Sequence, residues 1–195
     1  MNKKFMKRAI RLAMNNSADG KGGPFGAVVV RGGVVAGEGS NKVVESKDPS
    51  AHAEIVAIRA ACRKLGTHVL SGCEIYCSCE PCPMCLAAIY WARIDAVYFA
   101  CSSGDAAAAG FDDSAIREQV QLLQPFRNSG RHGGRPSRRS KSRVINNGGT
   151  ASTPSAAVLR ETPARIRSLP MRRLCREEGL DVLRKWIANP DKHPY

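Results

Sequence analysis

The sequence lacks any apolar run long enough to cross a membrane. None of its segments reaches the roughly 18 to 20 consecutive apolar residues that a membrane-spanning helix needs. The basic, amphipathic start, Met1–Arg11, also lacks the apolar stretch and the small-residue cleavage site of a secretory signal peptide. We therefore expect a cytoplasmic protein without a membrane partner.

Acidic and aromatic residues are scarce in the C-terminal part. Residues 121–195 carry 16 Lys and Arg against 5 Asp and Glu, whereas residues 1–120 carry 14 against 12. The stretch Arg127–Arg176 holds 13 basic residues, the single acid Glu161 and no Phe, Trp or Tyr. Because so little apolar surface cannot offset chain entropy, Asn128–Pro163 is expected to be disordered or an exposed loop. Binding of RNA or DNA phosphates is the less favoured interpretation, since no aromatic residues are interleaved for base stacking.

Composition places the chain among globular proteins. Of its 195 residues, 43% are apolar and 24% are charged, which fits one domain and excludes disorder throughout. Eight cysteines in a cytoplasmic protein favour free thiols and metal ligands over a disulfide framework. The expected division is a core at 1–125, a basic flexible insertion at 126–168, and a strand, helix and tail at 169–195 that complete the core.

Apolar periodicity and turn residues predict an α/β fold. Gly32 and Gly33 separate two β-branched runs and accept the positive φ of a tight turn, which predicts a hairpin. Asn15, Asn16 and Gly20 are expected to end the first helix. The predicted helices are Lys3–Met14, Ala51–Leu65, Cys82–Arg93, Ser114–Leu123 and Glu177–Ala188. The predicted strands are Phe25–Val30, Val34–Gly39, Glu74–Ser78, Ala96–Ala100 and Leu169–Cys175. Their order predicts three layers, with a mixed central sheet of about five strands and helices on both faces.

Two of these helices are expected to bury a stripe of residues spaced by three or four. In the helix Ala51–Leu65 the stripe is Ile55, Ile58, Ala61, Cys62 and Leu65. In the helix Glu177–Ala188 it is Leu180, Leu183, Trp186 and Ile187.

Two short motifs, each at the start of a predicted helix, carry metal-ligand chemistry. His52-Ala53-Glu54 opens one helix, and Pro81-Cys82-Pro83-Met84-Cys85 opens another about 30 residues later. Cys82 and Cys85 point to the same side of their helix, whose N-terminus stabilises thiolates. With His52 they form a set of three ligands. Three protein ligands leave the fourth position of a tetrahedral Zn²⁺ open to water, as in catalytic sites.

Glu54 lies two residues after His52, too close in sequence to be a comfortable fourth ligand. Zinc can lower the pKa of bound water to roughly 7, so that hydroxide is available at neutral pH. Glu54 is then placed to take a proton from the water and to deliver it to a departing nitrogen. The pairing of H-x-E with P-C-x-x-C is the signature of zinc deaminases.

The cysteines leave less favoured alternatives open. Cys77, Cys79, Cys82 and Cys85 could hold a structural zinc, but such a site usually joins two separated pairs, and this assignment leaves the H-x-E motif unexplained. Cys82 and Cys85 could also form a redox dithiol or be plain buried cysteines. The remaining four are expected to be ordinary small buried residues: Cys62, Cys73, Cys101 and Cys175.

With these motifs, the sequence resembles the cytidine deaminase-like superfamily. Three segments match its purine-type members: Gly22–Ala27, Asp48–Glu54 and Ser78–Cys85. Within the superfamily the sequence most resembles the small bacterial-type guanine deaminases, and Ala109–Asp113 and the terminal Pro194-Tyr195 are similar to guanine and guanosine deaminases in particular. The resemblance covers Phe5 to about Ala115 and about Leu169 to Tyr195, and it leaves the basic stretch unmatched.

The resemblance implies contacts to a purine base. Phe25 would stack on the base, and Asn41 would hydrogen-bond its edge. Asp113 would accept hydrogen bonds from the N–H groups that distinguish guanine from adenine, which suits an acceptor-only carboxylate. Considered without the resemblance, Phe25 would be a core residue and Asn41 a turn residue.

The resemblance also implies how the pocket is closed. Ala53 and the backbone near Cys79 and Glu80 would cradle the reacting edge, and Trp91, otherwise a core residue, would wall the pocket. In the family the C-terminal segment is exchanged between two subunits, so Tyr195 would close its own pocket or the partner's. This implies a homodimer.

The function implied is zinc-dependent hydrolytic deamination of guanine to xanthine and ammonia, as part of purine catabolism or salvage. Three alternatives remain open: a guanosine deaminase, a tRNA adenosine deaminase with the same zinc site, and a basic nucleic-acid-binding protein with a vestigial deaminase site. The near-neutral charge of residues 1–120 favours a small free base over RNA.

Overall fold

A computed structural model of the protein describes residues 2–18, 22–122 and 168–192. The chain divides into two units, and the unit formed by Met1–Leu122 and Leu169–Tyr195 contains nearly all of the described residues. The other unit, Leu123–Ser168, lies outside the described residues except for Ser168. The predicted basic insertion therefore stays a prediction.

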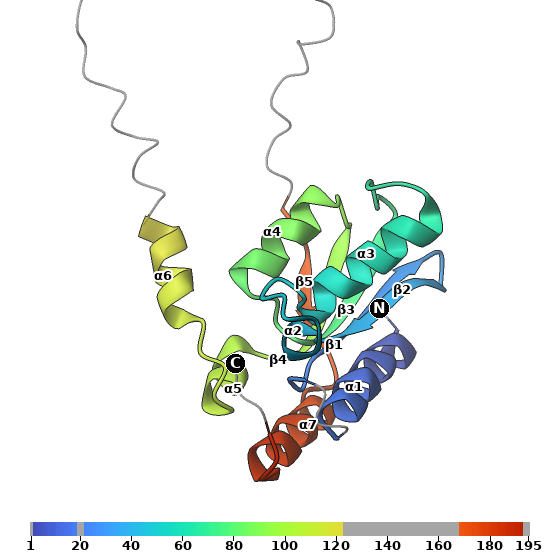
Figure 1. Cartoon of the computed structure of the whole chain (residues 1–195). Helices are drawn as coiled ribbons and strands as arrows, with labels where there is room; N and C mark the ends of the chain where they lie inside the picture. Colours follow the sequence, from blue (N-terminus) through green and yellow to red (C-terminus); the bar gives the residue numbers. More distant parts are fainter. Residues whose placement is uncertain (1, 19–21, 123–167, 193–195) are drawn as a thin grey trace, which may run out of the picture. The chain divides into compact units, whose positions relative to one another are not determined.

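A five-stranded mixed sheet forms the centre of the described unit, in the order β2-β1-β3-β4-β5 (Figure 1). β1 (Gly26–Arg31) pairs antiparallel with β2 (Val34–Ser40) and with β3 (Cys73–Cys79). β4 (Ala96–Cys101) runs parallel to β3 and to β5 (Met171–Arg173). The predicted α/β fold with a mixed central sheet is confirmed.

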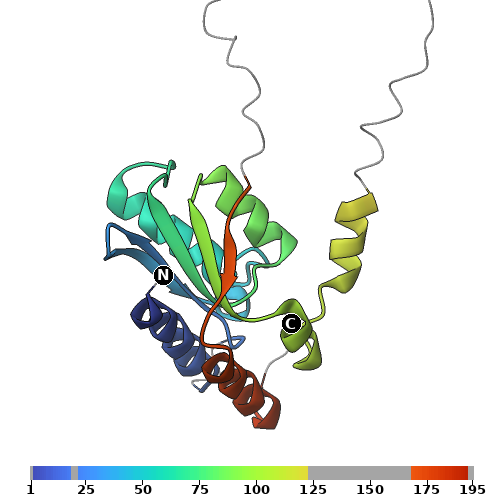
Figure 2. The same cartoon turned by 180° about the vertical axis from the view of Figure 1, so that it is seen from behind.

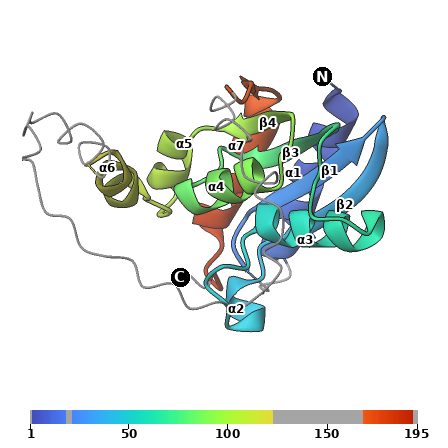
Figure 3. The same ribbon diagram turned by 90° about the horizontal axis from the view of Figure 1, so that it is seen from above.

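Helices cover both faces of this sheet. α1 (Lys3–Ala18) and α7 (Arg176–Ala188) lie side by side on one face (Figure 2). α3 (Ala53–Leu65) and α4 (Pro83–Trp91) lie on the opposite face (Figure 3). Because successive residues of a strand point to opposite faces, β1 contributes Val28 to the core beneath α1 and α7, and Val29 to the core beneath α3.

The turns and short helices complete the framework. Gly32 (φ 55°) and Gly33 (φ 77°) connect β1 to β2, as their sequence predicts. α6 (Ser114–Leu122) begins where it is expected, whereas α2 (Val43–Ser46) and α5 (Ser103–Ala108) are additions that the sequence did not indicate. None of the helices in the described ranges is long and apolar enough to cross a membrane.

The first helix continues past its predicted end. Asn16 lies inside α1, is only 5% exposed, and donates from Nδ2 to the carbonyl oxygens of Gly23 (2.9 Å) and Asn41 (3.0 Å). The prediction that Asn15 and Asn16 stop the helix is wrong, because tertiary acceptors satisfy the buried amide that would otherwise favour a cap.

The buried stripe of α3 differs from the predicted one. Ala57 is buried instead of Ile55, which is half-buried. The reason is the close approach of α3 to β2, where a Cβ on Gly37 would lie 2.4 Å from the backbone of Ala57 and of Ala61. Only small residues fit such an approach. Cys62 and Leu65, also predicted to be buried, are half-buried.

The buried stripe of α7 is likewise shifted. Gly179 faces β4, where a Cβ would lie 2.8 Å from Ala100 Cβ and Cys101 Sγ. The buried face runs through Gly179 and Val182, as well as the predicted Leu183 and Trp186. Ile187 is therefore 49% exposed and Leu180 half-buried, contrary to expectation.

All eight cysteines lie in the described ranges and are free thiols. Cys73 and Cys101 are buried, as expected of small apolar residues, while Cys62 and Cys175 are half-buried. The predicted strand Leu169–Cys175 is shorter than expected.

Candidate active site

Both sequence motifs lie where the first turns of α3 and α4 come together. His52 directly precedes α3 and Cys82 directly precedes α4, each in an extended backbone conformation. Pro83 follows as the first residue of α4, where a missing N–H costs no helical hydrogen bond. The side chains of both N-cap residues therefore remain free to point at a common centre, next to two positive helix ends.

The side chains of His52, Cys82 and Cys85 converge on one point. His52 Nδ1 lies 3.6 Å from Cys82 Sγ and 3.6 Å from Cys85 Sγ, and all three atoms are within 4.8 Å of one another. A tetrahedral Zn²⁺ with ordinary bond lengths places a nitrogen and a sulfur ligand about 3.6 Å apart. One imidazole and two thiols at this spacing fit zinc.

The thiols are electrostatically coupled. The pKa of Cys82 is lowered to about 4, chiefly by its interaction with the neighbouring Cys85 and also by its interaction with His52. The pKa of Cys85 is raised by the same interaction with Cys82 and by desolvation. The pKa of His52 is raised mainly by its hydrogen bond with Cys82. A lowered pKa favours the thiolate form of Cys82, which is the form that metals bind.

Glu54 is a buried carboxyl group in the first turn of α3. It is 8% exposed, and its Oε2 accepts a hydrogen bond from Cys85 Sγ at 3.5 Å. Burial raises its pKa above the ordinary value. A raised pKa makes the carboxylate a stronger base, which suits it to accept a proton.

A cavity of about 320 Å³ opens beside these groups. We call the side built on the sheet and on the starts of α3 and α4 the inner wall: Phe25, Asn41, His52, Glu54, Cys79, Glu80 and Cys82. We call the opposite side, built on α5, α6 and the loop between them, the outer wall: Ser103, Ala106, Gly110, Phe111, Asp112, Asp113, Ile116 and Arg117. A volume of this size suits a small molecule.

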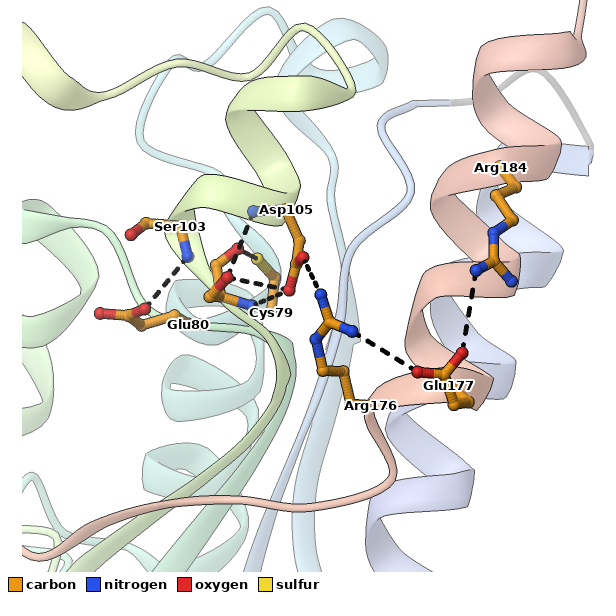
Figure 4. Close-up of polar contacts among 8 residues, drawn as sticks. Cys79, Glu80, Ser103, Asp105, Arg176, Glu177 and Arg184 are labelled. Carbon is orange, nitrogen blue, oxygen red and sulfur yellow. Dashed lines mark hydrogen bonds and ion pairs between the residues drawn. The ribbon is translucent and has the colours of Figure 1, made fainter.

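Polar side chains hold the start of α5 in the outer wall (Figure 4). Ser102 Oγ accepts from the Asp105 N–H (3.2 Å), and Asp105 Oδ2 accepts from the Ser102 N–H (2.8 Å), which forms a capping box. Asp105 Oδ1 also accepts from Arg176 Nη2 at the start of α7, at 2.6 Å. On the cavity side, Glu80 Oε2 accepts from the Ser103 N–H at 3.0 Å. The two walls are therefore joined at Glu80.

Aromatic rings also connect the inner wall to the outer wall. Phe25 and Phe111 meet edge to face, with ring centroids 4.7 Å apart and planes at 78°. Phe111 also contacts Trp186 of α7, at 5.5 Å between centroids. The outer wall thus rests on α7 as well as on the inner wall.

Most of the predicted substrate-binding residues line the cavity. Phe25, Asn41, Cys79, Glu80 and Asp113 all contribute to its walls. Asn41 is also the turn residue that its sequence context suggested, since its Oδ1 accepts from the Val43 N–H at 3.2 Å. Whether these residues contact a substrate stays a prediction.

Two predicted residues, Ala53 and Trp91, are described but do not line the cavity. Ala53 is buried between His52 and Glu54 and is not among the lining residues. Trp91 ends α4, is 84% exposed and is not among the lining residues, so its place in a pocket stays a prediction. Tyr195 lies outside the described residues.

Sequence reasoning missed several outer-wall residues, of which Arg117 and Phe111 are the most informative. Phe111 was noted only as part of a matching segment, and Arg117 follows Asp113 by four residues, a spacing that could have suggested an ion pair on a helix. No spacing rule, however, predicts which distant groups an arginine contacts.

Comparison with known proteins finds deaminases. Residues 1–101 match the model of the cytidine and deoxycytidylate deaminase zinc-binding region. The chain is 56% identical over 116 residues to a guanine deaminase of Bacillus subtilis (strain 168), a match that covers 60% of this chain and 74% of that protein. It is 45% identical over 95 residues to a tRNA-specific adenosine deaminase of Aquifex aeolicus, covering 49% of this chain and 62% of that protein.

Solved structures of guanine deaminases are similar to this chain as well. The X-ray structure of guanine deaminase from Bacillus subtilis superposes with a TM-score of 0.59 and 46% identity, covering 69% of this chain and 99% of that one. A guanine deaminase from Nitrosomonas europaea superposes with a TM-score of 0.66 and 26% identity, covering 97% of this chain and 86% of that one. The cytidine deaminase-like arrangement expected from the sequence is confirmed.

Proposed function

This chain belongs to the cytidine and deoxycytidylate deaminase zinc-binding family, and from that premise we propose that it hydrolyses guanine to xanthine and ammonia. The observation that carries the proposal is a single cavity that joins the His52, Cys82 and Cys85 group and the buried Glu54 to a carboxylate, Asp113, on the facing wall. The similarity to guanine deaminases along the segments that build this cavity supports the choice of base.

The three ligands His52, Cys82 and Cys85 would hold one zinc ion. When bound there, zinc would supply Lewis-acid activation of a water molecule, whose pKa it lowers to about 7. The fit rests on the 3.6 Å separation of the histidine nitrogen from each sulfur.

Glu54 carries the proton in this proposal. Its carboxylate takes one proton from the water as the oxygen bonds to C2 of guanine and the C2=N3 double bond opens, and it gives that proton to N3. Glu54 then takes the second proton, from the new C2 hydroxyl, and delivers it to the 2-amino nitrogen. The C2–N bond breaks, ammonia leaves, C2=O forms, and xanthine remains. Burial, which raises the pKa of Glu54, favours the protonated form that the second step requires.

The outer wall would select the base. Asp113 would accept from guanine N–H groups, because a carboxylate offers only acceptors. Within the described residues, Asp113 Oδ1 is the oxygen paired with Arg117, which leaves Oδ2 for the base. Phe25 would stack on the ring, and Asn41 would hydrogen-bond its edge, as part of the inner wall. The backbone at Ala53, Cys79 and Glu80 would border the reacting edge.

We also propose that the protein is a homodimer. α4 is apolar on all sides, yet it buries only Cys85 and Ile89. Met84, Tyr90 and Trp91 are exposed at 37%, 39% and 84%. Uncovered apolar side chains grouped on one helix are typical of a protein interface. Replacing Trp91 by Glu should convert the dimer to a monomer in sedimentation experiments.

Ammonia release tests the proposed function. Purified zinc-loaded protein is assayed with guanine, guanosine, adenine, cytosine and an anticodon-arm RNA, with Glu54→Gln as the inactive control. We expect release from guanine at a rate well above that from the other compounds. Release from the RNA alone would instead favour a tRNA adenosine deaminase. Salt-dependent RNA binding without turnover of any compound would favour a nucleic-acid-binding protein.

A further inference from the structure

α6 carries part of the outer wall but contributes almost nothing to an apolar core. Every described side chain of α6 is exposed except that of Arg117, and the apolar Ile116 and Val120 are 57% and 47% exposed. Within the described residues, burial of apolar side chains therefore does little to fix this helix. In that part of the chain, the polar contacts of Arg117 connect α6 to Glu80 and to Pro81.

The guanidinium group of Arg117 reaches three groups. Its Nε donates to Asp113 Oδ1 at 2.8 Å, and its Nη2 donates to the carbonyl oxygen of Pro81 at 3.1 Å. Its Nη1 lies 3.6 Å from Glu80 Oε1 in an ion pair. The side chain is 28% exposed and those of Asp113 and Glu80 are 21% and 24% exposed, so water screens these contacts only in part.

These three partners lie in the parts of the cavity whose relative position decides how guanine would sit above the metal ligands. Pro81 directly precedes the candidate ligand Cys82, and Asp113 is the proposed acceptor of guanine N–H groups. Glu80 holds the start of α5 through its bond from the Ser103 N–H, as Figure 4 shows. One side chain thus joins the turn that bears the metal ligand, the start of α5 and the recognition carboxylate.

Helix spacing alone does not account for this arrangement. An Asp and an Arg four residues apart on a helix commonly form an ion pair, so the Asp113 contact is ordinary by itself. The contacts to Glu80 and Pro81 join residues 36 or 37 positions away in the sequence and depend on the tertiary fold. A planar guanidinium with five N–H donors can serve three acceptors at once, which a lysine ammonium on a flexible stem does less well.

We propose that Arg117 is a positioning residue that fixes the Asp113 carboxylate at a set distance from the turn bearing the metal ligands. The proposal rests on the proposed guanine deaminase function for its kinetic consequence, because a misplaced carboxylate binds the base less well. The positioning itself is a property of the structure and can be measured without turnover.

The kinetic test compares three variants of the full-length, zinc-loaded protein. Arg117→Met keeps most of the length of the side chain and removes the charge. Arg117→Lys keeps the charge but loses the planar guanidinium with its several N–H donors. Arg184→Met is the matched control, because Arg184 forms exposed pairs with Asp181 (2.9 Å) and Glu177 (3.7 Å) on α7, away from the cavity lining.

We expect Arg117→Met to raise KM for guanine about tenfold while lowering kcat less than about threefold, since it weakens binding without touching the reacting groups. Zinc content should stay at the wild-type value. Arg117→Lys should lie between wild type and Arg117→Met, and Arg184→Met should match wild type. Unchanged KM in Arg117→Met, or a loss of zinc in parallel with activity, would overturn the proposal.

Hydrogen–deuterium exchange separates this proposal from the proposed function. In Arg117→Met and, to a smaller extent, in Arg117→Lys, amides of residues 103–121 should exchange faster than in wild type, while Arg184→Met should leave them unchanged. If wild type releases no ammonia from guanine, the function fails, but the exchange result still decides whether Arg117 positions the outer wall. Unchanged exchange in Arg117→Met, or equal acceleration in Arg184→Met, would refute the positioning role.

Discussion

The two walls of the cavity face each other, but different interactions hold them. On the inner wall, the carbonyl oxygens of His52 and Cys82 accept the first helical hydrogen bonds of α3 and α4, from Val56 and Leu86, both at 2.9 Å. The candidate metal ligands are thus fixed by the backbone of helices that rest on a buried core. The outer wall depends on side chains, chiefly Arg117, Arg176 and the capping box of α5.

This difference separates reactivity from selectivity. Groups that would activate water and move protons lie where the backbone allows little movement, which the geometry of bond formation requires. Asp113, which would distinguish guanine from adenine, lies directly before the short helix α6 and is held by the side chain of Arg117. Regions held by few contacts open at a lower free energy than a core, so the outer wall is the part suited to admitting a substrate.

Removal of one metal ligand should have the largest effect. Cys82→Ala should abolish zinc binding and turnover together, because two ligands are too few to retain the ion against water. Metal analysis and ammonia release on the same sample measure both. Cys62→Ala, a half-buried cysteine on α3 away from the ligand group, should keep its zinc. Full zinc content in Cys82→Ala would contradict the ligand assignment.

Removal of the proton carrier should have the next largest effect. Glu54→Gln should lower kcat by about 10² to 10⁴-fold and leave zinc bound, since the amide keeps the size of the side chain but cannot accept and release the proton. Stopped assays with metal analysis test this. Glu45→Gln, which removes an exposed carboxylate paired with Lys42, should behave as wild type. Near-normal turnover in Glu54→Gln would exclude the proposed role.

A change on the outer wall should separate selectivity from metal binding. Asp113→Asn should lower kcat/KM for guanine by about 10 to 10²-fold, because an amide presents a donor where the base also presents donors. Zinc content should not change. Asp181→Asn, which removes an exposed carboxylate paired with Arg184, is the matched control. Equal loss of zinc and of activity in Asp113→Asn would show that the two walls are not independent.

The contact between α7 and α5 should give the smallest effect. Arg176→Met removes the donor to Asp105, but the capping box still holds the start of α5, so KM for guanine should rise no more than about threefold. Steady-state kinetics at low and high salt measure this, since an exposed ion pair weakens with ionic strength. A tenfold or larger increase would mean that α7 controls the outer wall directly.

The inner wall was largely predictable from the sequence because its signals are local. His52, Glu54, Cys82 and Cys85 lie within a few residues of helix starts that proline and the apolar pattern mark. The hairpin followed from Gly32 and Gly33 in the same way. In each case the residue and the reason for its position are close together in the chain.

The outer wall was less predictable because its contacts join distant segments. The place of Arg117 depends on Glu80 and Pro81, and that of Asp105 depends on Arg176. Trp91, which the resemblance places in a pocket wall, is exposed in one chain, and nothing near it in the sequence indicates what would cover it. The sequence around Asn16 predicts a helix end, because nothing nearby in the chain indicates the two distant carbonyl oxygens that accept from its side chain.

The position of β5 at the edge of the sheet has a consequence for synthesis on the ribosome. β4 ends at Cys101 and its neighbour β5 begins at Met171, so about 70 further residues must be made before β4 gains its second partner. At roughly 5 to 20 residues per second this takes several seconds. During that time the edge of β4, which carries Val97, Tyr98 and Phe99, offers unpaired backbone groups beside apolar side chains. Until β5 is made, this unpaired edge is a site at which the nascent chain can aggregate.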